Sequence, residues 1–291
     1  MIKVLHPGLY TSVQDFGRFG VQAYGVPISG VMDRQAASFA NAILGNPKGS
    51  PVLEITMVGP KLEFQCHTSV CVSGADMSPK LNGTEVPTNK LVSVKKGDIL
   101  SFGKLNFGFR TYLAVSGGFK TEQILNSRSM YQGITQTSKI EKNNILDIAP
   151  QDAITLEHHA AIKMQHDYIL TEKIEVLKGP EFDKLSEVQK SLLFNTRFTI
   201  SKDNNRMAYQ LDEVLENHLK PIITSLVLPG TVQLTPSGKL IVLMRDCQTT
   251  GGYPRVLQLK ESAINTVSQK FTGQAIQFVL HEYKALINMG L

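Results

Sequence analysis

Apolar and polar residues alternate with a period of two along most of this chain, and Gly, Pro, Asn or Asp interrupts the alternation at short intervals. A period of two places successive side chains on opposite faces of a β-strand, so the pattern predicts many short strands and few helices. The expected fold is therefore mainly β. The clearest examples of the pattern lie at residues 62–64, 70–73, 92–94, 99–102, 111–115, 174–177, 198–201 and 277–280.

A few segments show a helical pattern instead. Asp33 can cap a helix over residues 34–44 that Gly45 ends. A second helix is predicted over residues 183–194, and short helical turns are predicted near residues 260–265 and at the C-terminal end. The side chains expected on the buried face of the second helix are Leu185, Val188, Leu192 and Leu193.

Strand alternation is lost near residues 160–173, which predicts a boundary between two β domains, 1–172 and 173–291. The segment that follows the boundary, residues 174–180, faintly echoes residues 2–8. This echo favours two similar halves.

The composition narrows the classes of function. Hydrophobic residues make up 42% and charged residues 19% of the 291 positions, as in globular proteins, and the apolar runs fall short of the ~20 residues that span a bilayer. Residues 1–7 are typical of a first strand rather than of an export signal, so we expect a cytoplasmic protein without a membrane anchor. The net charge of +5 is spread along the chain, which argues against nucleic-acid binding.

Cysteine and histidine give no sign of a metal site. Cys66, Cys71 and Cys247 stand at spacings that match no zinc or redox motif, and Cys247 is expected to be a packed bystander thiol rather than a nucleophile. The histidines at 158, 159 and 166 lack further ligands at a recognised spacing. We therefore predict no bound metal.

Residues 225–255 join a buried strand to a dense polar loop. The apolar run at 240–244 reads as the strand, and residues 235–240 as a hairpin turn rather than a phosphate loop. Gly251 and Gly252 are expected to take positive φ and bring the loop close to a ligand, although an ordinary polar hairpin is the alternative. The candidate site residues of this loop are Asp246, Gln248, Thr249, Thr250, Gly251, Gly252, Tyr253 and Arg255.

Two further segments are candidates for ligand binding. A Gly-punctuated loop over residues 15–33 enters a helix N-terminus, where amides and the helix dipole suit an anion; the alternative is that Asp33 only caps the helix and that Asp15 and Arg18 form a structural ion pair. Arg206, between turn-forming Asn residues, can present a planar fork to a carboxylate or phosphate, or be an exposed loop Arg. The candidates in these segments are Asp15, Arg18, Ser29, Gly30, Asp33, Arg206 and Tyr209.

Taken in order, these segments resemble one protein family over nearly the whole chain. The family comprises the C subunit of 5-oxoprolinase, also called allophanate hydrolase subunit 2 or KipA, within the biotin-dependent carboxyltransferases. Residues 127–137 depart from its pattern, because relatives continue there with Gly-Gly and Gly-Arg. The motifs that carry the resemblance lie at residues 8–9, 30–33, 40–41, 45–46, 53–54, 110–118, 205–209, 227–233 and 246–255.

The resemblance implies two cyclophilin-like β-barrel domains and a partner subunit of the KipI type. It implies a subunit of an ATP-dependent 5-oxoprolinase, which opens a small-molecule lactam to glutamate, with a third hydrolase subunit in the complex. ATP is implied by the family and is not visible as a motif. Two alternatives stay open: a non-enzymatic regulator of a sporulation-type histidine kinase, and a carboxyltransferase module that serves a biotinylated protein, since this chain has no biotin attachment site of its own.

In this interpretation Asp246, Arg206 and Arg255 are the catalytic residues. The two arginines would hold carboxylate or phosphoryl oxygens, and Asp246 would act as an acid, a base or an orienting carboxylate. Tyr253 and Gln248 would position the substrate, and the loop at 15–33 would form a second wall of the same cleft.

Overall fold

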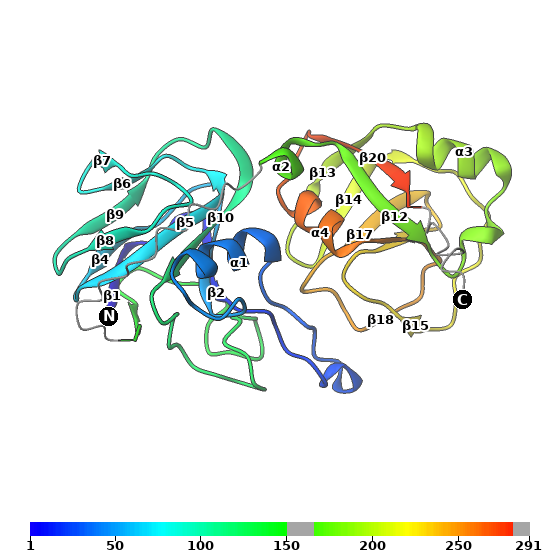
Figure 1. Cartoon of the computed structure of the whole chain (residues 1–291). Helices are drawn as coiled ribbons and strands as arrows, with labels where there is room; N and C mark the ends of the chain where they lie inside the picture. Colours follow the sequence, from blue (N-terminus) through cyan, green and yellow to red (C-terminus); the bar gives the residue numbers. More distant parts are fainter. Residues whose placement is uncertain (150–165, 282–291) are drawn as a thin grey trace, which may run out of the picture.

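The computed structural model describes residues 1–149 and 166–281, which form two lobes lying side by side (Figure 1). We call residues 1–149 the N-terminal lobe and residues 166–281 the C-terminal lobe. Strands dominate both lobes, so the prediction of a mainly β chain is confirmed. The predicted boundary between residues 172 and 173 stays a prediction, because part of the surrounding segment lies outside the described residues.

The N-terminal lobe consists of two sheets around one apolar core, with α1 packed against β5 and β10. The strand orders are β11-β1-β4-β9-β6-β7 and β2-β3-β10-β5-β8. Its elements are β1 (Ile2–His6), β2 (Tyr10–Gln14), η1 (Gln22–Tyr24), α1 (Arg34–Ile43), β3 (Val52–Thr56), β4 (Lys61–Phe64), β5 (Thr68–Asp76), β6 (Pro79–Leu81), β7 (Thr84–Glu85), β8 (Val92–Val94), β9 (Ile99–Phe102), β10 (Phe107–Val115) and β11 (Ile145–Leu146).

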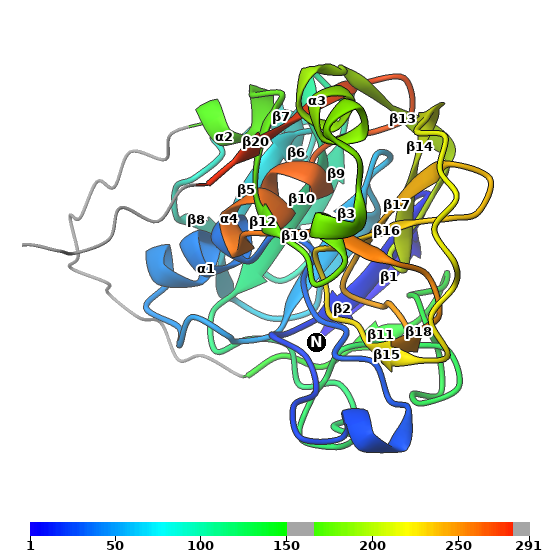
Figure 2. The ribbon, with the colours of Figure 1, turned by 90° about the vertical axis from the view of Figure 1, so that its right-hand side faces the viewer.

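The C-terminal lobe is a closed barrel with the strand order β12-β19-β16-β17-β14-β13-β20, and a small β15-β18 sheet lies outside it. Figure 2 shows this lobe facing the viewer, with the N-terminal sheets behind it. Its elements are α2 (Asp167–Leu170), β12 (Lys173–Lys178), η2 (Phe182–Lys184), α3 (Glu187–Asn195), β13 (Phe198–Asn204), β14 (Ala208–Val214), β15 (Ser225–Leu226), β16 (Thr231–Leu234), β17 (Lys239–Leu243), β18 (Thr250–Gly251), β19 (Arg255–Leu259), α4 (Glu261–Ser268) and β20 (Ala275–Leu280).

Each of the eight example segments of alternating pattern lies in a strand, and the turn at residues 235–240 joins β16 to β17 as predicted. The helix predicted over residues 34–44 is α1, and Ala36, Ala37 and Ala40 of the predicted apolar face are buried. The helix predicted over residues 183–194 begins later, because Ser186 caps α3 with a capping box to Gln189. Its predicted buried face was partly wrong: Val188 is 70% and Leu192 50% exposed, and Leu193 alone among the helix residues is buried.

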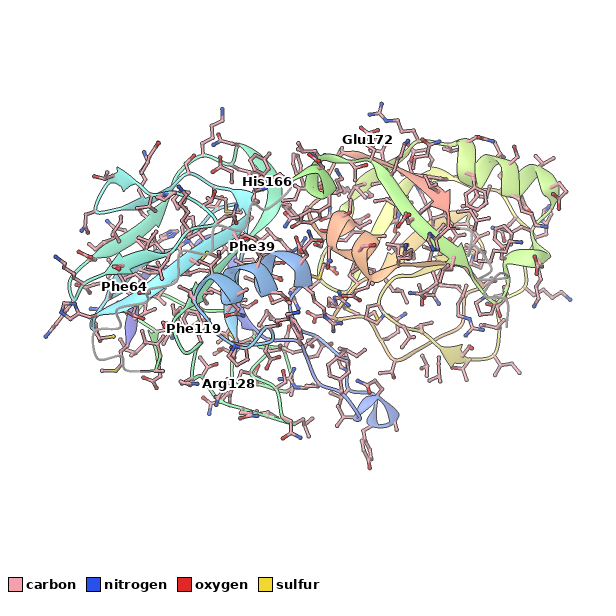
Figure 3. All side chains as sticks on the ribbon, in the orientation of Figure 1. Phe39, Phe64, Phe119, Arg128, His166 and Glu172 are labelled. Atoms are coloured by element: carbon pink, nitrogen blue, oxygen red, sulfur yellow. The ribbon has the colours of Figure 1, made fainter. Side chains whose placement is uncertain are left out.

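Polar contacts join the two lobes along α4 and the residues after it. Gln269 accepts hydrogen bonds from the amides of Phe109 and Arg110 at 3.0 Å each, and its amide group donates to Asp33 at 2.8 Å. Figure 3 labels His166 and Glu172, which flank α2 where the chain passes between the lobes. These contacts hold β10 and the start of α1 against the C-terminal lobe, next to the candidate site.

Within the described ranges, no helix combines the length and the apolar character that a membrane span requires.

Candidate functional site

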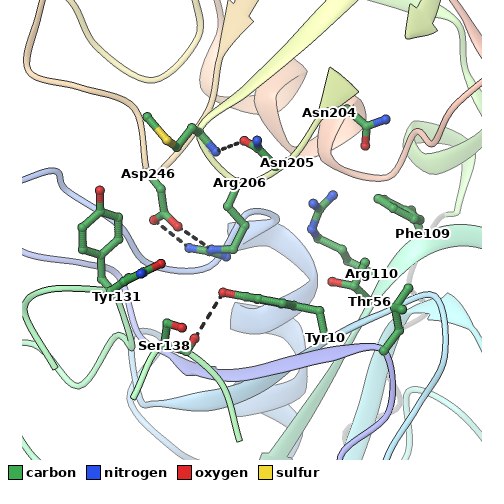
Figure 4. Close-up of a pocket in the computed structure, with 13 residues that line it drawn as sticks. Tyr10, Thr56, Phe109, Arg110, Tyr131, Ser138, Asn204, Asn205, Arg206 and Asp246 are labelled. Carbon is green, nitrogen blue, oxygen red and sulfur yellow. Dashed lines mark hydrogen bonds and ion pairs between the residues drawn. The ribbon is translucent and has the colours of Figure 1, made fainter. Parts of the chain in front are cut away.

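A cavity of about 480 Å³ lies between the lobes, and both lobes contribute to its lining (Figure 4). The N-terminal lobe supplies residues from β2, β10 and the loop near Tyr131, and the C-terminal lobe supplies residues from the β13–β14 turn and the loop after β17. The lining residues are Leu9, Tyr10, Thr56, Phe109, Arg110, Tyr131, Gln132, Ser138, Asn204, Asn205, Arg206, Met207 and Asp246.

The central polar pair of the cavity is Arg206 with Asp246. The side chain of Asn205 accepts hydrogen bonds from the amides of Met207 at 2.7 Å and Ala208 at 3.1 Å, which forms the turn that presents Arg206. Arg206 Nε and Nη2 donate to the two carboxylate oxygens of Asp246 at 2.8 and 3.1 Å. The sequence places these residues forty positions apart, and the fold brings them together in one cavity, as expected. The fork of Arg206 was expected to hold a ligand, but it holds Asp246 instead.

Arg206 is buried rather than exposed, and its other donors are also engaged. Nη1 donates to Glu54, and Nη2 donates to the carbonyl of Gly30 at 2.6 Å and to Gln14 at 3.3 Å. Burial acts to lower the pKa of Arg206, but the charges of Asp246 and Glu54 raise it above the ordinary value. Arg206 therefore stays charged, and its fork holds the protein's own carboxylates.

Glu54 and Arg110 belong to this network, and the sequence-based site did not include them. Glu54, on β3, is 1% exposed, and its carboxylate accepts hydrogen bonds from the amide of Met32 at 2.7 Å and the hydroxyl of Tyr112 at 3.0 Å. Arg110, on β10, lies 3.7 Å from Glu54 and donates to the hydroxyl of Tyr209. Each of these residues is the only charged residue in an otherwise apolar strand. That pattern is the sequence signal that could have indicated a buried network of charges.

Two tyrosines flank the Arg206–Asp246 pair. Tyr10 lies on one side and donates from its hydroxyl to the carbonyl of Ser138 at 3.2 Å, while Tyr131 lies on the other side near Asp246 (Figure 4). Burial raises the pKa of Tyr10, and burial together with the charge of Asp246 raises the pKa of Tyr131. Both hydroxyls therefore stay protonated at neutral pH. The proton of Tyr10 is directed to Ser138, and that of Tyr131 can be donated to a group in the cavity.

Asp15 and Arg18 hold the segment that carries Tyr131. The carboxylate of Asp15 accepts hydrogen bonds from the hydroxyls of Ser127 at 2.6 Å and Ser129 at 2.7 Å, and Arg18 donates to the carbonyl of Ser129. Asp15 and Arg18 thus form no direct ion pair with each other in the described part of the chain. Neither residue lines the cavity, so the loop at 15–33 supports its wall rather than forming it.

Ser29 and Gly30 adopt positive φ angles of 57° and 90° beneath the cavity. A Cβ at Gly30 would lie 2.7 Å from the backbone of Phe16, so only glycine fits there while its carbonyl accepts from Arg206. The amide of Ser29 donates to the carbonyl of Arg245 at 2.9 Å, which ties this loop to the residue before Asp246.

The start of α1 does not offer the anion site that the sequence suggested. The carboxylate of Asp33 accepts from the amide of Ala36 at 3.0 Å, and the side chain of Asn265 accepts from the amide of Arg34 at 3.0 Å. The second oxygen of Asp33 accepts from the Tyr168 hydroxyl at 2.7 Å and from Gln269. Side chains of the protein therefore accept the hydrogen bonds from these backbone amides at the start of α1. The alternative interpretation, in which Asp33 caps the helix, is correct.

We expect Asp33→Ala to lower the free energy of unfolding by about 2–3 kcal/mol, because it removes a cap and leaves two buried donors unpaired. The matched control is Ser186→Ala, which removes the solvent-accessible cap of α3 and should cost about 1 kcal/mol. Urea unfolding followed by circular dichroism measures both. Equal losses in the two variants would show that Tyr168 and Gln269 contribute nothing through Asp33.

The polar loop after β17 divides between the cavity and the surface. Asp246 lines the cavity, whereas Gln248 and Thr250 are exposed and Thr249 is half-buried. Thr250 and Gly251 form β18, which pairs with β15 outside the barrel. The hairpin alternative does not describe this loop either, because β17 and β19, the strands that it joins, are not neighbours in the barrel.

The expected positive φ at Gly251 and Gly252 was wrong, since neither is among the residues with positive φ in the described chain. A Cβ at Gly251 would lie 2.5 Å from the end of the Gln233 side chain, so a larger residue there would require that side chain to move. Tyr253 is 39% exposed, and Arg255 forms an ion pair with Glu181 at 3.0 Å. Neither Tyr253 nor Arg255 is among the described lining of the cavity. We expected both residues to share one cleft with Arg206 and Asp246, and that expectation was wrong for these two.

Tyr209 is fully buried on β14, inside the barrel core. Its hydroxyl accepts a hydrogen bond from Arg110, and the cavity lining of the described residues does not include it. Tyr209 therefore positions Arg110 rather than facing a ligand directly.

Cys247 is 4% exposed and packs with Val227 and Leu243, and burial raises the pKa of its thiol to about 12. Burial raises the pKa of Cys71 to about 12 as well, while Cys66 is half-buried.

We expect a thiol reagent at mildly alkaline pH to modify Cys66 alone in the folded protein and every cysteine after unfolding, because the thiolate is the reactive form. Rapid modification of Cys247 in the native protein, read by mass spectrometry, would contradict this.

The described residues contain no group of three or more His, Cys, Asp or Glu side chains arranged to hold a metal ion. His158 and His159 lie outside the described residues. His166 contacts the ring of Phe107 edge-on at 5.2 Å and lies 3.5 Å from Asn89.

Comparison with known proteins gives a consistent result. Residues 24–280 match the model of the family described as carboxyltransferase domain, subdomain A and B. The C subunit of 5-oxoprolinase from Escherichia coli (strain K12) is 30% identical over 285 residues, which cover 96% of this chain and 91% of that protein. The urea amidolyase of Saccharomyces cerevisiae is 28% identical over 311 residues, covering 98% of this chain but 17% of that protein.

The crystal structure of the K. lactis urea amidolyase superposes with a TM-score of 0.85 and 30% identity over 97% of this chain, although the match spans 19% of that chain. The fold and the sequence thus agree over nearly the full length of this protein. The chain therefore belongs to the family of the carboxyltransferase domain, subdomains A and B, together with the C subunit of 5-oxoprolinase.

Proposed function

We propose that this chain is one subunit of an ATP-dependent 5-oxoprolinase and acts with a KipI-type partner subunit. The observation that carries the proposal is the match to the C subunit of the Escherichia coli 5-oxoprolinase, which covers 96% of this chain and 91% of that protein. The match to urea amidolyase covers 17% of the yeast protein. The 5-oxoprolinase subunit, which has nearly the same length as this chain, is therefore a simpler functional counterpart than the much longer urea amidolyase.

The cavity between the lobes suits the substrate side of this reaction. A lactam is a poor electrophile, and phosphorylation of its oxygen turns that oxygen into a leaving group, a step that requires charged groups and hydrogen-bond donors held in place. The hydroxyl of Tyr131 and the Arg206–Asp246 pair provide such groups beside a cavity of about 480 Å³. Both oxygens of Asp246 are bonded to Arg206, so we assign Asp246 an orienting role rather than that of a free acid.

ATP would supply the phosphoryl group when bound, but the described residues do not fit a nucleotide site. They contain no glycine-rich phosphate loop that opens a helix, and Asp33 and Asn265 close the start of α1. In this proposal, nucleotide binding is a property of the assembled complex.

The test is co-purification of the chain with its partner, followed by an assay of glutamate formation from 5-oxoproline. We expect ATP-dependent turnover by the complex and none by the isolated chain, because a nucleotide site is not found on its described part. Reactions without ATP serve as the control. Turnover by the isolated chain would show that the chain is complete as a catalyst and would refute the proposed subunit role.

A second candidate, carboxyl transfer with a biotinylated protein, is favoured by the description of the family whose model matches residues 24–280. The same preparation distinguishes the two. Transfer of carboxylate from carboxybiotin by a complex that does not open 5-oxoproline would favour the second candidate.

A further inference from the structure

Arg110 is a buried cation with one edge of its guanidinium group open. It extends from β10 into the lining of the cavity and is 2% exposed (Figure 4). Its Nη1 donates to the hydroxyl of Tyr209 and to the carbonyl of Ser268, and the guanidinium lies 4.8 Å from the ring centre of Phe109. These contacts come from both lobes and fix the orientation of the group.

The opposite edge, formed by Nε and Nη2, makes no hydrogen bond to a described residue, although Nε forms an ion pair with Glu54. Nε is buried without a hydrogen-bond acceptor, and Nη2 makes no hydrogen bond to any described residue. The nearest carboxylate atom to Nε is Glu54 Oε1 at 3.7 Å, which is beyond hydrogen-bonding distance. An unpaired buried guanidinium edge is costly, and a ligand that supplies two acceptors would satisfy it.

The other arginines assigned to the site do not have such an edge. The same edge of Arg206 is taken by Asp246, and the corresponding donors of Arg255 bind Glu181. Arg18 also has unpaired nitrogens, but it is not among the described residues that line the cavity. Arg110 is thus the lining arginine whose fork is free for a ligand.

We propose that Arg110 binds the carboxylate of the substrate through Nε and Nη2. This inference rests on the proposed function and deepens it, because 5-oxoproline carries a carboxylate next to its lactam nitrogen. Glu54 makes no hydrogen bond to Arg110, because its oxygens are taken by Arg206, Tyr112 and the amide of Met32, and the charge of Arg206 offsets that of Glu54. Bound in this way, the lactam ring would lie in the cavity between Arg110 and the Arg206–Asp246 pair.

The test compares 5-oxoproline with 2-pyrrolidinone, which has the same ring without the carboxylate. Binding to the chain assembled with its partner is measured by calorimetry for wild type and Arg110→Lys, which keeps the charge but loses the planar fork. We expect Arg110→Lys to weaken 5-oxoproline binding about 10- to 100-fold and to leave 2-pyrrolidinone binding nearly unchanged. The matched control is Arg197→Lys, in a surface ion pair with Glu172, which should change neither affinity.

A second measurement uses the wild-type chain and does not depend on how the variant folds. The Nε resonance of Arg110 is followed by NMR during titration with acetate or inorganic phosphate, and we expect it to shift with acetate. If wild type binds neither lactam but acetate still shifts this resonance, the carboxylate site stands and the proposed substrate is wrong.

Three results would overturn the inference itself. The first is an equal loss of affinity for both lactams in Arg110→Lys, which would indicate a structural role. The second is an unchanged preference for 5-oxoproline in that variant. The third is a resonance that responds to phosphate and not to acetate, which would assign the site to a phosphoryl group.

Discussion

Glu54→Gln is expected to lower the free energy of unfolding by about 3–5 kcal/mol, the range seen when one partner of a buried ion pair is removed. Glu54 is 1% exposed and lies between the guanidinium groups of Arg206 and Arg110. Glutamine has nearly the same size, so the change leaves no cavity. The substitution removes the negative charge that lies between the two buried arginines, and it places an amide donor against one of the two guanidinium groups.

The measurement is urea unfolding followed by circular dichroism. The control is Glu187→Gln, since Glu187 pairs with Lys190 on the surface of α3 and its side chain is 89% exposed. That variant should remain close to wild type, because exposed ion pairs contribute little. A loss for Glu54→Gln no larger than that of the control would mean that the network between the lobes does not stabilise the fold.

The strands and α1 could be predicted because local patterns specify them. Alternation at period two identifies strands without any knowledge of their partners, and the Asp33 cap with its alanine face identifies α1. The face of α3 was harder to predict. Val188 and Leu192 are apolar, yet they face solvent, and the sequence pattern does not show which side of this helix packs against the barrel.

The candidate site was predicted in part, for a similar reason. The turn chemistry of Asn205 and the abrupt polar end of β17 mark Arg206 and Asp246 locally. Arg255 has the same local appearance, but Glu181, more than seventy positions earlier, occupies its fork. Whether an arginine is free depends on such distant partners, and a single sequence does not show them.

The sequence-based prediction wrongly included Arg255 in the site, and it also missed two residues that belong there, Glu54 and Arg110. Each is one charged residue in a strand of apolar neighbours, and local pattern alone suggests a side chain facing solvent. Their burial results from contacts with the C-terminal lobe, Glu54 with Arg206 and Arg110 with Ser268. A charge in an otherwise buried strand was a signal that the sequence contained, because such residues are seldom fully buried without a partner.

Asp246→Asn should reduce turnover of the assembled complex about 100-fold or more, the scale associated with a positioned polar group in the transition state. The carboxylate of Asp246 accepts hydrogen bonds from Arg206 Nε at 2.8 Å and from Nη2 at 3.1 Å. Asparagine would place its amide nitrogen, which is itself a donor, against one of these two nitrogens. The fork would open, and Arg206 would lose the orientation that it shares with Gln14 and Gly30. We therefore expect a lower kcat with a smaller change in KM.

The same substitution also removes half of a buried ion pair, so a loss of activity has to be separated from a loss of folded protein. Turnover is measured at a temperature at which circular dichroism shows the variant folded and co-purification shows it bound to its partner. Asp212→Asn, on the exposed side of β14 and outside the described cavity lining, is the control and should keep the wild-type kcat. If the folded, assembled Asp246→Asn complex also keeps that kcat, Asp246 supports the junction between the lobes and takes no part in the reaction.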